Sequence, residues 1–234
     1  MGAVGQNELA TAAAPERSLF RAEERNKAGK IGRKWSISNR DPNVQTEPDR
    51  RFSVRHLASQ ELDLLERLDW SRYAGYGRGI LVRSEAQHLL LVSVPRVLRE
   101  YPCSTARAGL GHERSSGRTP TGWHEIGAKI GDGLPPGAVL RQRRWDGEIW
   151  HPGDETGEDL ILGRILRLSG LERGRNLGGE VDSWKRMIYI HGTNQEQLLG
   201  TPASAGCIRL SREDITDLYD RVEVGHRVVV VPGG

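Results

Sequence analysis

The sequence contains few residues of the kinds that cross-link a chain or anchor it in a membrane. Among its 234 residues there are two cysteines, two methionines and two phenylalanines. Two cysteines cannot build a disulfide scaffold, and without a Cys-x-x-Cys pair a structural zinc site is not expected. No run of about 20 apolar residues occurs, so no transmembrane helix is expected. A single bridge between Cys103 and Cys207 remains open on these grounds.

An excess of one charge is also lacking. The chain has 34 Lys and Arg against 31 Asp and Glu, a net charge of +3, with a sequence pI near 9.0. Because both signs are mixed along the chain, a nucleic-acid partner is not expected. A mildly basic surface would suit an anionic polymer such as the cell wall. The first 60 residues contain no apolar stretch of the kind found in secretory signal peptides.

The apolar fraction of 36% and the mean hydropathy of −0.56 are low for a fully folded chain. They predict one folded domain with a polar extension. Residues 1–50, dominated by Ala, Gly, Asn, Glu, Arg and Lys, are predicted to be a disordered arm. Residues 51–78 are predicted to form a short helix and a linker, and residues 79–232 the domain. The apolar residues at near-helical spacing in that helix are Leu57, Leu64, Leu65 and Leu68.

Short apolar runs bounded by turn residues predict that this domain is mainly β. A helix is predicted after Ser211, a good N-cap, with an apolar face at the spacing i, i+3, i+4 and i+7. That face consists of Ile215, Leu218, Tyr219 and Val222. The predicted strands are 80–82, 89–92, 97–101, 161–168, 186–190 and 228–231.

A histidine and a cysteine each adjoin an apolar run. His191 follows the predicted strand 186–190, and Cys207, sixteen positions later, lies between Gly206 and a second run. A thiol is a good nucleophile as thiolate, and a nearby imidazole can take its proton. Gly206 lets the backbone approach a substrate, and its N–H is a candidate donor to an oxyanion. The pair alone is a weak signal, because buried cysteines and core histidines are common.

The surrounding residues make the signal specific, because this stretch resembles the signature of the L,D-transpeptidase catalytic-domain family. These are peptidoglycan cross-linking enzymes with a catalytic cysteine. Their signature is a His-Gly-Thr-like run, a variable loop, then Ser/Thr-His-Gly-Cys, an apolar residue and Arg or Asn. The similarity extends over about residues 79–231. Here the signature reads His191-Gly192-Thr193 and Ser204-Ala205-Gly206-Cys207-Ile208-Arg209. Earlier in the chain, Thr119-Pro120-Thr121-Gly122 resembles a Thr-Pro-Thr-Gly motif that opens a strand in the family.

The resemblance implies a role for each matching residue. Cys207 would be the nucleophile and His191 the general base and acid, with the ring of His191 oriented by the backbone carbonyl of Gly192. Gly206 would contribute to the oxyanion hole. Ala205 stands where the family has its second histidine, which puts oxyanion support or loop order in question. The flanking residues assigned to substrate binding are Ser204, Arg209 and Thr193.

For these flanking residues a structural role is an equal or better alternative. Arg209 either pairs with a substrate carboxylate or holds the loop through an ion pair. Ser204 either contacts substrate or makes a local backbone hydrogen bond. Thr193 is expected mainly to settle the turn after the histidine. The loop 171–184 is either a lid or a surface insertion.

The resemblance also implies a fold and an activity. The fold is a mainly β mixed sheet or sandwich with a few short helices, one directly after Cys207. The activity is that of a peptidoglycan L,D-transpeptidase. The cysteine forms a thioester with a tetrapeptide stem, releasing D-alanine, and an amine of an acceptor stem takes the acyl group. The alternatives are an L,D-carboxypeptidase or amidase of the same fold, and an inactive peptidoglycan-binding module, for which Ala205 is the only support.

The remaining expectations concern partners and surroundings. The partners are peptidoglycan stem peptides, with no metal and no organic cofactor implied, and the oligomeric state is left open. An extracytoplasmic location is expected from the family.

The other cysteine and the other histidines point to structure rather than chemistry. Cys103 is interpreted as a small core residue. His124-Glu125 does not begin a His-Glu-x-x-His zinc motif, because Ala128 occupies the closing position. His112, His151 and His226 are interpreted as surface or loop residues, since their spacing is not that of metal ligands.

Overall fold

The computed structural model describes residues 54–74 and 77–233. The predicted arm over residues 1–50 lies outside this part of the chain, and the proposed division into arm, linker and domain stays a prediction. The helix expected around residues 57–70 is present as two short helices, α1 (Ser59–Arg67) and α2 (Trp70–Ala74). No helix of the described residues is long and apolar enough to cross a membrane.

The described part of the chain is mainly β, as the sequence predicts. Its strands belong to one mixed sheet, and its longest helix, α3 (Arg212–Arg221), follows directly after Cys207 and β10. In chain order the strands are β1 (Arg55–His56), β2 (Gly79–Arg83), β3 (His88–Ser93), β4 (Arg96–Pro102), β5 (Gly122–Ile130), β6 (Ala138–Arg141), β7 (Arg144–Ile149), β8 (Ile161–Gly170), β9 (Tyr189–Thr193), β10 (Ile208–Leu210) and β11 (Arg227–Val231). Two 3₁₀ turns, η2 (Gly179–Val181) and η3 (Glu196–Leu198), lie in the connections.

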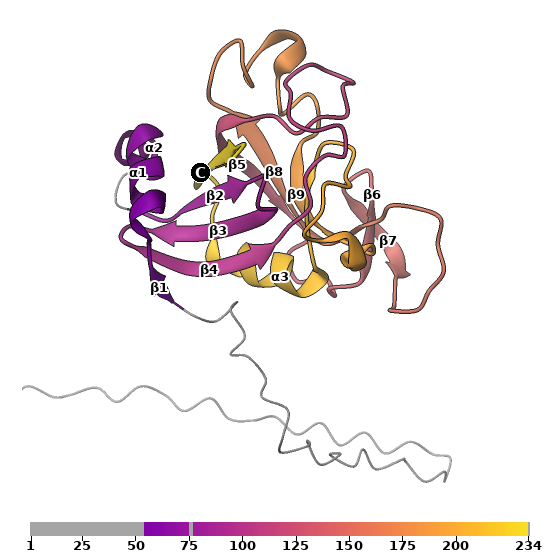
Figure 1. Cartoon of the computed structure of the whole chain (residues 1–234). Helices are drawn as coiled ribbons and strands as arrows, with labels where there is room; N and C mark the ends of the chain where they lie inside the picture. Colours follow the sequence, from indigo (N-terminus) through magenta and orange to yellow (C-terminus); the bar gives the residue numbers. More distant parts are fainter. Residues whose placement is uncertain (1–53, 75–76, 234) are drawn as a thin grey trace, which may run out of the picture. The chain divides into compact units, whose positions relative to one another are not determined.

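The sheet joins an N-terminal meander to the strands around the cysteine. Its order is β1-β4-β3-β2-β11-β5-β8-β6-β7, and β9 branches from β8 and pairs with β10 (Figure 1). The pairs β2–β11 and β9–β10 are parallel and the others antiparallel. Parallel neighbours require a crossover, which here brings the end of the chain back beside β2. The last strand, β11, therefore joins β2 to β5 in the middle of the sheet.

Apolar side chains cover both faces of the sheet. On one face α3 packs against β8 and β9, and the four residues predicted as its apolar face are all buried, three of them within α3 and Val222 at its C-cap. On the other face α1 and α2 pack on the meander, with Trp70 and Tyr73 both in contact with the indole of Trp123. The ring centroids of Tyr73 and Trp123 lie 4.6 Å apart, nearly parallel. The burial of these apolar side chains on both faces of the sheet is the main source of the domain's stability.

The helix α3 begins where its sequence indicates. Ser211 has extended backbone angles, and its hydroxyl accepts a hydrogen bond of 3.0 Å from the backbone N–H of Asp214. This bond satisfies one of the backbone donors that a helix leaves free in its first turn. Because α3 starts directly after β10, the cap also fixes the point where β10, the strand that follows Cys207, ends.

The strand expected at 186–190 is wrong in its position. The structure has a turn up to Met187, and β9 begins at Tyr189 and continues through His191 to Thr193. Met187 takes a left-handed conformation with φ +57°, and its N–H bonds to the carbonyl of Trp184 at 3.1 Å. This turn keeps Met187 out of the ladder. His191 therefore lies in the middle of its strand rather than at the end.

The loop 171–184 is fastened along its length to the start of β5. The amide of Asn176 donates to the carbonyls of Thr121 and Trp123, each at 3.0 Å. The hydroxyl of Ser183 lies 2.9 Å from Nε2 of His124, and both residues are fully buried. Burial lowers the pKa of His124 to about 4, so its imidazole is neutral at pH 7. These bonds favour a fixed connection over a lid.

Candidate active site

Two rows of side chains cross the strands β8, β9 and β10 on the face opposite α3. In the ladder Arg167 faces Tyr189, and Ile165 faces His191, which in turn faces Arg209 on the parallel strand β10. Extending the β9–β10 register by one residue sets Cys207 beside Tyr189. Side chains on paired residues share a face, so both His191 and Cys207 project from this side of the sheet.

The register also fixes how far apart the histidine and the cysteine are. His191 lies on β9, and Cys207 directly precedes the neighbouring strand β10, with an offset of two residues when the register is extended to it. A strand spacing of about 4.8 Å and a rise of about 3.3 Å per residue put their Cα atoms about 8 Å apart. An imidazole and a thiol that lean toward each other can span this separation. The sheet therefore positions His191 directly and Cys207 through the residue that follows it, Ile208, the first residue of β10.

His191 is buried and its ring is oriented by the backbone. Its Nδ1 lies 2.8 Å from the carbonyl oxygen of Gly192, and only a protonated nitrogen can donate to that carbonyl. Nε2 is then the basic nitrogen. Burial lowers the pKa of His191, so the free ring is neutral near pH 7. A side chain at Gly192 would not fit, because a Cβ there would lie 2.5 Å from the carbonyl oxygen of Leu162.

The thiol of Cys207 is half-buried and lies 3.5 Å from the carbonyl oxygen of Met187. Burial raises its pKa to about 11 and outweighs the backbone N–H of Tyr189 and the charges of Arg209 and Arg186, which lower it. Together with the neutral imidazole this describes a resting thiol–imidazole pair without charge. If such a thiol attacked a substrate, the thiolate would have to form during the attack, with the imidazole taking the proton.

The loop before Cys207 is held by its own hydroxyl groups. Ser204 donates from Oγ to the carbonyl of Cys207 at 2.5 Å and accepts from the N–H of Gly206 at 3.2 Å. Thr119 Oγ1 donates to the carbonyl of Gly206 at 3.0 Å. Gly206 has φ +133°, a conformation that favours glycine. Ala205 is exposed, so the position of the missing histidine lies at the surface of a loop that these bonds already order.

Arg209 is buried, with 3% of its surface exposed, and forms an ion pair with Asp159. Its other terminal nitrogen donates to the side-chain oxygen of Gln195 at 3.1 Å. This placement favours the structural ion pair over direct contact with a substrate carboxylate. Asp159 raises the pKa values of both His191 and Cys207, and Arg209 lowers them. The pair therefore places two opposed charges beside Cys207 and His191.

Asp159 was not recognised from the sequence. It is one of several acidic residues in a polar loop, and only the folded chain brings it to Arg209, 50 residues away. Thr193 is fully buried, and its hydroxyl accepts a hydrogen bond of 3.1 Å from the N–H of Gln195. That bond belongs to the turn after β9, in keeping with the structural alternative for Thr193.

The second cysteine lies apart from this site. Cys103 is fully buried in the core beneath α3, burial raises its pKa to about 12, and both cysteines are free thiols. This confirms its interpretation as a core residue. Within residues 54–74 and 77–233, no group of three or more His, Cys, Asp or Glu side chains is arranged to hold a metal ion.

Comparison with known proteins shows which family this chain resembles. The L,D-transpeptidase catalytic domain family (YkuD) matches residues 77–231, a span that includes both His191 and Cys207. A probable L,D-transpeptidase of Salmonella typhimurium, ErfK/SrfK, is 35% identical over 92 residues, which is 38% of this chain and 30% of that protein. A putative L,D-transpeptidase of Bacillus subtilis, YkuD, is 32% identical over 82 residues, 30% of this chain and 50% of that protein. The matched segments thus cover half or less of these relatives.

Solved structures of L,D-transpeptidases resemble the chain more distantly. One from Mycobacterium smegmatis has a TM-score of 0.40 at 21% identity, over 66% of this chain and 59% of that one. One from Xylanimonas cellulosilytica has a TM-score of 0.40 at 20% identity, over 74% of this chain and 70% of that one.

Proposed function

Since this chain belongs to the L,D-transpeptidase catalytic domain family, we propose that it is a cysteine acyltransferase that cross-links peptidoglycan stem peptides. Cys207 is the nucleophile and His191 the general base and acid. The observation that carries the proposal is the register of β9 and β10, which, extended by one residue to Cys207, sets both side chains on one face of the sheet. The bond from Nδ1 to Gly192 supports it, because it leaves Nε2 as the base.

The first half-reaction forms a thioester. As Sγ of Cys207 attacks the carbonyl carbon, Nε2 of His191 takes the thiol proton. The tetrahedral oxyanion then collapses, the carbon–nitrogen bond breaks, and the leaving amine departs with the proton from His191. The donor is a tetrapeptide stem, and the amine released is D-alanine. The acyl group remains on sulfur.

The second half-reaction frees the enzyme. The side-chain amine of an acceptor stem attacks the thioester, loses a proton to His191, and the thiolate of Cys207 leaves and is protonated again. Water in place of the amine would give hydrolysis. Each donor to the oxyanion is worth about 3 kcal/mol in such reactions. We assign one such donor to the N–H of Gly206, which in the resting loop bonds to Ser204 and would exchange that bond for the oxyanion.

The order of the nucleophile loop favours an enzyme over an inactive binding module. Ala205 removes the family's second imidazole, yet Ser204 and Thr119 together hold the backbone on both sides of Gly206. The loop before Cys207 therefore keeps its order without that imidazole. We place the activity outside the cytoplasm, where peptidoglycan is cross-linked.

The test is turnover of a defined donor. The full chain is incubated with a disaccharide-tetrapeptide donor and an amine acceptor, and released D-alanine and cross-linked product are followed by mass spectrometry. The proposal predicts both products in equal amounts, and neither from Cys207→Ala or His191→Gln. Released D-alanine with water as the only acceptor would identify a carboxypeptidase and overturn the transferase assignment. Absence of D-alanine release from the wild type would refute the proposal that the protein is an enzyme acting on this donor.

A further inference from the structure

Next to the nucleophile lies a cluster of guanidinium groups that no carboxylate neutralises. Arg167 faces Tyr189 across β8 and β9, in the row that ends at Cys207. Arg143, at the tip of the β6–β7 hairpin, reaches the same tyrosine, with Nη1 3.2 Å from its phenol oxygen. Nη1 of Arg143 also lies 3.6 Å from the sulfur of Met187, whose carbonyl is 3.5 Å from Sγ of Cys207. The phenol of Tyr189 therefore stands between two cations on the nucleophile's face.

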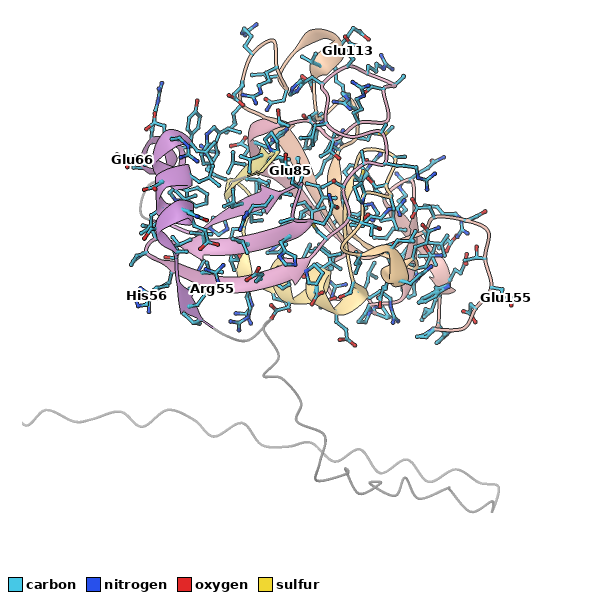
Figure 2. All side chains as sticks on the ribbon, viewed as in Figure 1. Arg55, His56, Glu66, Glu85, Glu113 and Glu155 are labelled. Atoms are coloured by element: carbon cyan, nitrogen blue, oxygen red, sulfur yellow. The ribbon has the colours of Figure 1, made fainter. Side chains whose placement is uncertain are left out.

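Neither cation has an acidic partner within the described part of the chain. Arg167 stacks on the ring of Trp184 and donates to its carbonyl, and its Nε is buried without a hydrogen-bond partner. The charge of Arg143 lowers the pKa of Arg167, as does burial, so the two guanidinium groups repel each other. The exposed carboxylates of Glu113 and Glu155 lie on separate loops and point outward (Figure 2).

Two other buried or half-buried arginines of the sheet have acidic partners, whereas Arg164 on β8 donates only to backbone carbonyls. Arg209 pairs with Asp159 and Arg227 with Glu125. Two unneutralised, partly desolvated cations held close together are unfavourable in the free protein, and an anion bound between them would relieve the repulsion. Guanidinium groups bind carboxylates through paired hydrogen bonds, and a phenol hydroxyl can add a third donor.

We propose that Arg143 and Arg167, with the hydroxyl of Tyr189, form the receptor for the C-terminal carboxylate of the acyl donor. This assignment rests on the proposed function and specifies which end of the donor the enzyme reads. The attacked carbonyl carbon sits about 3 Å from the nucleophile, and the carboxylate of the leaving amino acid lies about 5 Å further along the chain. In that direction Tyr189 lies on the strand next to Cys207, with Nη1 of Arg143 at its hydroxyl, and Arg167 lies one strand further on. The enzyme thereby selects donors whose leaving residue ends in a free carboxylate.

The test compares two donors in a matched set of variants. One donor ends in D-alanine and the other in D-alaninamide, and kcat/KM is measured from release of the terminal residue. Hydrogen bonds to a charged group predict that the wild type prefers the acid by about 10- to 100-fold. Arg143→Gln should lose this preference because kcat/KM falls for the acid donor alone. Its kcat/KM for the amide donor should stay within about twofold of the wild-type value. Arg144→Gln is the control, because it removes the same charge from the neighbouring, exposed residue of the hairpin.

Each outcome decides the assignment. Equal losses with both donors in Arg143→Gln would show that Arg143 only supports the fold around Met187, and would overturn it. Retention of the preference in Arg143→Gln, or its loss in Arg144→Gln, would do the same. Arg143→Lys should restore part of the preference, because it returns the charge without the planar fork. If the wild type turned over neither donor, the proposed function itself would fail. If the wild type turned over the acid and amide donors equally well, only the assignment of the carboxylate receptor would be refuted.

Discussion

The thiol of Cys207 should react slowly with an alkylating agent at neutral pH and about tenfold faster with each unit of added pH. Burial raises its pKa to about 11 from an ordinary value of 9.0. At pH 7 a group of pKa 11 is ionised in about one molecule in 10,000, which is about a hundredfold less than an ordinary thiol. The imidazole of His191 does not compensate, since burial lowers its pKa and leaves it uncharged.

The assay is the rate of iodoacetamide labelling, followed by intact mass between pH 6.5 and pH 9.5. Only the thiolate reacts, so the logarithm of the rate should rise with pH at a slope near one across the whole range. Cys103 is fully buried, so the native Cys207→Ala variant should take up no label. A rate that levels off below pH 8 would show a standing thiolate–imidazolium pair. It would refute the inference that proton transfer accompanies the attack.

Three further predictions follow from the same structure. Asp159→Asn should lower the pKa of Cys207, because Asp159 raises it, and should move the pH profile of labelling to lower pH. Glu158→Gln, on the same loop, should leave the profile unchanged. A shift of the Asp159→Asn profile to higher pH would contradict the prediction. Ser211→Ala should cost about 1 kcal/mol in urea unfolding by removing the cap of α3, whereas Ser211→Asp should retain most of the stability. The free energy of unfolding should fall as pH drops from about 6.5 to 4, because His124 is protonated in the unfolded chain while burial holds its folded pKa near 4. The loss of stability from this group approaches about 3 kcal/mol. If the stability of a His124→Gln variant fell with acid as steeply as that of the wild type, the prediction would be contradicted.

The sequence predicts the parts of the fold where side-chain pattern follows burial. Short apolar runs with turn residues between them predict the meander β2–β4, and apolar residues at helical spacing predict the buried face of α3. The hairpin β6–β7 is not, because every residue of β7 is exposed and no alternation marks it. The position of β9 was misjudged because apolar Met187 continues the run in sequence, while its left-handed backbone ends the preceding turn.

The candidate site divides in a similar way. The motif places Cys207 and His191, and the structure adds what lies across strands from them. Asp159 and Arg143 reach the site from a loop and a hairpin tip, and no local pattern distinguishes either from the other charged residues of the chain. Such contacts arise from topology, which joins β8, β9 and β10 side by side despite their separation in sequence.

The central claim, that Cys207 is an acylatable nucleophile, is tested most directly by intact mass after incubation with a carbapenem. The strained lactam is an acyl donor that a competent thiol opens to a thioester, and the drug's mass is then added to the protein. The account predicts one adduct on the wild type, none on Cys207→Ala, and a strongly slowed reaction in His191→Gln. An unmodified wild type, or an adduct that persists in Cys207→Ala, would contradict it.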